Sequence, residues 1–104
     1  MALTQNNPPR RLSGGKLKMY VKGHRVTWGQ ALTKGKALYE KIRSELEANH
    51  AGQYVYIDVY SGDHEVAPDR KTAERRMFER HPDAVLWGRT IGHEGNDKAA
   101  NCYD

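Results

Sequence analysis

The feature that most constrains the fold is a long amphipathic stretch that follows Thr27. Thr27 and Gln30 match the capping-box pattern, in which two side chains satisfy free backbone N–H groups at the start of a helix. The pattern predicts a helix from about Trp28 to Asn49, with Trp28 in the core and with Gly35 at a close crossing with another backbone. At 100° per residue the apolar positions fall within an arc of about 120°: Trp28, Ala31, Leu32, Gly35, Leu38, Tyr39, Ile42 and Leu46.

A strict alternation follows that helix and predicts a strand over Tyr54–Tyr60. One face of this strand carries Val55, Ile57 and Val59, and the other carries three tyrosines around Asp58. A turn at residues 61–63 would lead into a short return strand over His64–Ala67.

The remaining elements are a second helix and a last strand. Asp69 is the expected N-cap of the helix, which must stop before Pro82, and the strand is expected over Ala84–Ile91. A weak alternation over Lys16–Val26 suggests a further hairpin that turns at Lys22. These elements predict an α+β fold: a small, three- to four-stranded, mostly antiparallel sheet with two helices packed on one face.

The chain has 104 residues, which is enough for one ordinary domain. Residues 1–15 read as a flexible basic tail, because proline, glycine and arginine replace apolar residues there. We expect a single α+β domain over 16–91 and a flexible polar tail over 92–104.

Several classes of protein do not fit the composition. No apolar run approaches the roughly 20 residues of a membrane helix, and no apolar segment near Met1 reads as a secretory signal. Cys102 is the only cysteine, which excludes an intrachain disulfide and a cysteine-based zinc cluster. We therefore expect a cytoplasmic protein.

Catalytic and metal-binding patterns are weak. Asp58, Asp63, His64 and Glu65 surround one turn, but their spacing fits no zinc pattern, and a solvated hairpin tip is the simpler interpretation. No glycine elbow, phosphate-binding loop or nucleophile with a neighbouring base is recognisable. We expect no enzyme activity and no cofactor. The competing hypothesis is an enzyme that uses Asp58, Asp63 and His64.

The aromatic row on the predicted strand suggests a binding surface. If both helices cover the valine face, the tyrosines stay on an open face, which can form a partner or homodimer interface. Arg89 could pair with Asp58 there if their strands are neighbours, and the opposite possibility is that the N-terminal segment buries the row. The predicted partner-binding residues are Tyr54, Tyr56, Tyr60, Trp87 and Arg89.

Basic residues support an alternative function, nucleic-acid binding. The formal net charge is +4, and the second helix carries several cations, although Glu74 and Glu79 dilute them. The tyrosine face could stack bases in the same complex. The residues predicted for this role are Arg70, Lys71, Arg75, Arg76 and Arg80.

Residues Tyr54–Gly92 resemble a group of short uncharacterised bacterial proteins. The resemblance rests on the strand that ends in Ser61-Gly62-Asp63, the second short strand, the helix, and the Arg80-His81-Pro82-Asp83-Ala84 entry to the last strand. It implies an antitoxin-like role, because members of that group often look like accessory genes beside small hydrolases. It defines no catalytic residues.

Overall fold

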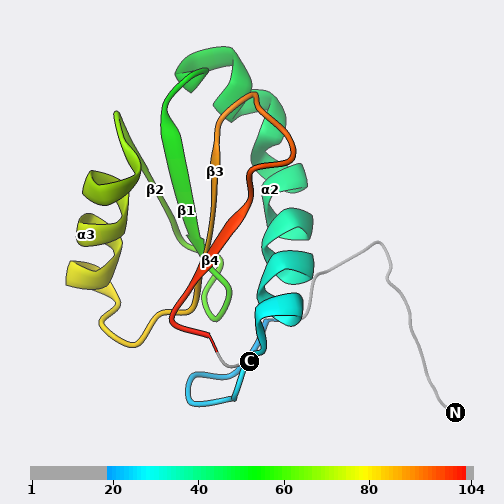
Figure 1. Ribbon diagram of the computed structural model, residues 1–104, viewed down its shortest axis with the longest axis vertical. Helices are drawn as coiled ribbons and strands as arrows, with labels where there is room; N and C mark the ends of the chain where they lie inside the picture. The colour runs from blue at the N-terminus through cyan, green and yellow to red at the C-terminus, as the bar shows by residue number, and fades with distance from the viewer. Residues whose placement is uncertain (1–18, 103–104) are drawn as a thin grey trace, which may run out of the picture.

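A four-stranded antiparallel sheet organises residues 19–102, the part of the chain that this computed structural model describes (Figure 1). The strands lie in the order β2-β1-β3-β4. The α+β class and the antiparallel sheet are confirmed, and β1 is central, with β3 beside it. The strands are β1 (Tyr54–Asp58), β2 (His64–Ala67), β3 (Leu86–Thr90) and β4 (Lys98–Ala100).

The predicted long helix is α2, Trp28–His50, and its capping box is present. The Gln30 backbone N–H donates to Thr27 Oγ1 at 3.1 Å, and the Thr27 N–H donates to Gln30 Oε1 at 2.9 Å. The expectation that Trp28 is a core residue is wrong, because its side chain is 52% exposed. A helix of 23 residues is about 34 Å long, about twice the length of a five-residue strand, so its first turn extends past the sheet.

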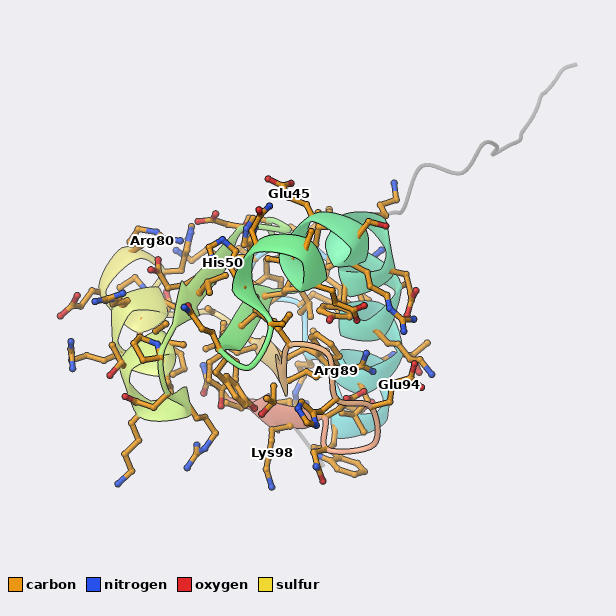
Figure 2. All side chains as sticks on the ribbon, turned by 90° about the horizontal axis from the view of Figure 1, so that it is seen from above. Glu45, His50, Arg80, Arg89, Glu94 and Lys98 are labelled. Atoms are coloured by element: carbon orange, nitrogen blue, oxygen red, sulfur yellow. The ribbon has the colours of Figure 1, made fainter. Side chains whose placement is uncertain are left out.

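The two helices lie on opposite faces of the sheet, which corrects the expectation that both cover one face. Seen from above, α3 (Arg70–Arg80) and α2 stand on either side of the strands (Figure 2). The α2 helix packs on Val55, Ile57 and Trp87, whereas Ala73 and Met77 of α3 pack on Tyr54 and Tyr56. Both sides of β1 are apolar enough to need cover, and all five of its residues are buried.

Gly35 allows α2 to approach the sheet closely. A Cβ at this position would overlap the Cβ and Cγ atoms of Trp87, whose side chain is fully buried. The expected close crossing is therefore present, but its partner is the Trp87 side chain instead of a backbone. Tyr39 packs on the same indole, with the ring centroids 5.3 Å apart.

The C-terminal segment belongs to the sheet, which corrects the expected flexible tail over 92–104. Residues Lys98–Ala100 form β4, in which Ala99 pairs with Trp87 of β3. At the other end, the expected basic tail over 1–15 lies outside the described residues. Within residues 19–26 the expected hairpin has its turn at Lys22 and Gly23 but no strands.

Substituting Gly35 by alanine tests this packing. Alanine is the better helix former by about 1 kcal/mol, yet the added methyl group has no space beside Trp87. We expect Gly35→Ala to lower the free energy of unfolding by about 1–3 kcal/mol in a urea titration. Gly29→Ala is the matched control, because a Cβ there meets nothing within 4 Å, and it should be neutral or stabilising. Equal stabilisation by both substitutions would contradict the packing.

Candidate functional site

The predicted aromatic face is not an open surface. Tyr54 is 7% exposed and Tyr56 is 1% exposed, because α3 covers them. Tyr60 lies beyond the end of β1, half-buried, and its hydroxyl donates to the backbone oxygen of His24 at 2.7 Å. Trp87 and Arg89 belong to the other face, under α2. The five predicted partner-binding residues therefore do not form one accessible surface in the described fold.

Arg89 is a buried structural cation. Its guanidinium packs against both the Tyr39 and the Trp87 rings, 4.7 Å and 5.1 Å from their centroids. Nε and Nη2 donate to the two carboxylate oxygens of Asp97 at 2.7 Å and 3.0 Å, and these hydrogen bonds raise the pKa of Arg89. The expected pairing with Asp58 is wrong: β1 and β3 are neighbours, but Arg89 is opposite Val55 and so lies on the other face.

Removing Asp97 should therefore be costly. Asp97→Ala leaves the Arg89 charge buried without its acid, and we expect a loss of about 3 kcal/mol in the free energy of unfolding. Glu79→Ala is the control, because its ion pair with Arg75 is long, at 3.9 Å, and exposed, and it should cost less than about 0.5 kcal/mol. Similar losses in both variants would contradict the assigned role of the Arg89–Asp97 pair.

The cations of α3 are largely matched by acids. Arg70 pairs with Glu74 at 3.5 Å, and Arg75 pairs with Glu79 at 3.9 Å, each within the helix. Arg76 and Arg80 reach the β1–β2 hairpin: Arg76 lies 3.8 Å from Glu65, and Arg80 contacts both Glu65 and Asp63. Lys71 is exposed. These five residues share one helix, but neighbouring acids neutralise much of their positive charge.

A polar cluster joins the end of α3 to the β1–β2 turn. The buried Asp58 accepts hydrogen bonds from the Tyr60 N–H at 3.0 Å and from Ser61 Oγ at 2.8 Å. His81 has Nε2 at 2.9 Å from Asp63 Oδ2 and Nδ1 at 3.9 Å from Asp58 Oδ2. His64, expected beside these acids, is exposed, and His81 takes that place.

The geometry of this cluster favours a structural role. The Ser61 hydroxyl donates to a carboxylate and also accepts the Asp63 N–H at 3.1 Å, which tightens the turn. Within residues 19–102 no group of three or more His, Cys, Asp or Glu residues could hold a metal ion. Sequence reasoning missed His81; its place between the α3 C-terminus and Pro82 was the available signal.

The Asp63 carboxylate gives the cluster a pH dependence. Burial alone would raise its pKa, but hydrogen bonds from His81 and Arg80 outweigh burial and lower the pKa to about 2, from an ordinary 3.8. A lowered pKa adds stability above the unfolded value, and this stability is lost as the pH falls from about 4 to about 2. Wild type should therefore be more stable than Asp63→Asn above about pH 4 in urea titrations. A difference that stays constant down to pH 3 would contradict this.

The exposed large hydrophobic residues of the described chain all lie within one ten-residue stretch. We name Met19, Val21 and Trp28 the apolar pole; they are 38%, 77% and 52% exposed. The stretch forms the blue and cyan loop, with the first turn of α2, at the lower end of Figure 1. It rests on a buried cluster made of Val26, Ala31, Val59 and Val85.

Two clefts meet at this end of the molecule. One, of about 450 Å³, is lined by Met19, Tyr20, Val21, His24 and Lys34. The other, of about 500 Å³, shares His24 and continues past Lys22 and Tyr60 to Cys102. The Tyr20 and His24 rings stack between them, 5.1 Å apart and nearly parallel. Met19 and Val21 of the apolar pole thus line a cleft beside the stacked rings, whereas Trp28 lines neither of these two clefts.

Comparisons with known proteins identify no relative of this chain: no protein-family model, no curated protein and no solved structure matches it. The resemblance of Tyr54–Gly92 to short bacterial proteins stays a prediction. Neither α2 nor α3, the helices of the described residues, is long and apolar enough to cross a membrane.

Proposed function

We propose that the protein is a non-enzymatic module that binds a protein partner through the apolar pole. One observation carries the proposal. The described chain buries its large apolar residues on both faces of the sheet and leaves Met19, Val21 and Trp28 exposed together in ten residues. Exposed apolar residues that gather in one place are typical of interaction sites, whereas scattered ones need no explanation.

The support beneath the apolar pole favours binding with little rearrangement. Val26, Val59 and Val85 are 1%, 0% and 4% exposed under the loop, and the Tyr60 hydroxyl fixes the backbone of His24. A loop that is held by a packed core loses less conformational freedom when it binds, which improves affinity. An antitoxin-like role, implied by the resemblance of Tyr54–Gly92, would fit a cytoplasmic bacterial module that covers part of its partner's surface.

Nucleic-acid binding is the second candidate, and one observation favours it. Residues 1–39 include eight Lys and Arg residues and no acid, because the first acidic residue of the chain is Glu40. Such segregated charge attracts phosphate backbones in a salt-dependent way. The α3 cations contribute less to this candidate than the sequence suggested, since Glu65, Glu74 and Glu79 lie beside them.

Single substitutions in the apolar pole test the proposal. Val21→Ser and Trp28→Ser should change the free energy of unfolding by less than about 0.5–1 kcal/mol, because both side chains are largely exposed. Neither variant should capture the proteins that the wild-type chain captures from a nuclease-treated bacterial lysate. Lys98→Ser, at an exposed position of β4, is the control and should capture the same proteins as wild type.

Sedimentation of the purified chain completes this test. If the wild-type chain sediments as a dimer and both pole variants sediment as monomers, the protein partner is a second copy of the chain. Unchanged capture and unchanged sedimentation in the two pole variants would contradict the proposed function. Capture that disappears on nuclease treatment would favour the nucleic-acid candidate instead.

A further inference from the structure

We propose that the apolar pole accepts an acidic segment of a partner protein, in which one apolar side chain fills the cleft beside Met19 and Val21 while flanking carboxylates meet Lys22 and Lys34. This inference rests on the proposed function and names the chemistry of its partner. It follows from the charge distribution, from the surroundings of the two lysines, and from the shape of the cleft.

The charge of the chain is divided in a way that its net value of +4 conceals. Residues 1–39 carry eight basic residues and no acid, for a formal charge of +8. Residues 40–104 carry nine basic and 13 acidic residues, for a formal charge of −4. The segment that contains the apolar pole therefore brings no acid of its own, and an acidic partner complements it.

The two lysines are available to such a partner. Lys22 lies 3.5 Å from Asp83, but both side chains are about 70% exposed, and an exposed pair of this kind is weak enough to exchange. Lys34 lies over the Tyr20 ring, 5.9 Å from its centroid, on the wall of the apolar cleft. Burial and the nearby charge of Lys41 lower the pKa of Lys34, so a carboxylate placed beside it would be favourable.

The cleft favours an apolar side chain over a nucleobase. Met19 and Val21 form its apolar wall and offer no flat ring for stacking, and the Tyr20 ring is already stacked on His24. A volume of about 450 Å³ is ample for an aliphatic or aromatic anchor. Two copies that met pole to pole would bring Lys22 and Lys34 of both chains together, which disfavours such a dimer.

A random peptide library displayed on phage is a suitable probe, selected on the immobilised full-length chain. We expect enriched sequences in which an aliphatic or aromatic residue is flanked by Asp or Glu. The affinity of the strongest synthetic peptide, measured by fluorescence anisotropy, should fall severalfold between about 50 and about 300 mM NaCl. Lys22→Glu and Lys34→Glu should each weaken it about fivefold.

The control is a lysine-to-glutamate substitution outside the apolar pole. Lys71→Glu changes an exposed lysine at the start of α3, near the end of the sheet where Tyr54 pairs with Ala67, far from the apolar pole. It should leave the peptide affinity unchanged, and Val21→Ser should abolish binding. Circular dichroism of each variant verifies that the fold persists.

Three outcomes would overturn the inference. Enriched peptides without acidic residues, still lost in Val21→Ser, would refute the acidic partner and leave the proposed function standing. Peptide binding that is indifferent to Val21→Ser and Trp28→Ser would refute both. A labelled single-stranded oligo-dT that competes with the peptide and binds more tightly, with the same dependence on Lys34, would identify nucleic acid as the ligand.

Discussion

The rest of the structure depends on the burial of β1 on both of its faces. All five residues from Tyr54 to Asp58 are buried, so the strand needs a helix on each side, and the chain provides α2 before it and α3 after it. Close approach on one side requires Gly35 against Trp87, and on the other it uses Ala73, which has no exposed surface. Asp58 is tolerated in this strand because Tyr60 N–H and Ser61 Oγ satisfy its carboxylate.

This double burial restricts where the protein can bind anything large. A sheet covered on both faces leaves its ends, its edges and the outer surfaces of its helices. The ends differ, because α2 is much longer than the strands that it covers and projects Trp28 beyond them. The loop of residues 19–27 lies at this same end of the molecule, beside the start of α2 (Figure 1). The mismatch in length thus accounts for the exposure of Trp28, one of the three residues of the apolar pole.

Local signals in the sequence predicted the elements, and long-range ones were missed for physical reasons. The caps at Thr27 and Asp69 act within three residues, so both helix starts were predictable. Period two shows that Tyr54 and Tyr56 share a face but not whether water or a helix lies on it. The signal for two-sided cover was that both faces of the strand are apolar, with the tyrosines on one face and Val55 and Ile57 on the other. The three residues of β4 are too few for periodicity, and the contact that fixes them, Arg89 with Asp97, depends on the fold. Trp28 satisfied the apolar arc, but an arc carries no information about where the sheet ends.

The charges of the chain follow the same division between framework and apolar pole. From Glu40 onward, the arginine side chains contact acids that the fold places beside them: Arg43 contacts Glu47, Arg80 contacts Asp63, and Arg89 contacts Asp97. These pairs connect α2, the β1–β2 hairpin, α3, β3 and the loop before β4, so their charges serve the fold. Before Glu40 the chain supplies only cations, and the structure gives Lys22 an exposed contact and Lys34 a ring. Charge changes at the apolar pole are therefore expected to cost little stability, whereas removing one partner of the buried Arg89–Asp97 pair is expected to cost much more. The charged residues of such a surface can be substituted to match a partner while the protein stays folded.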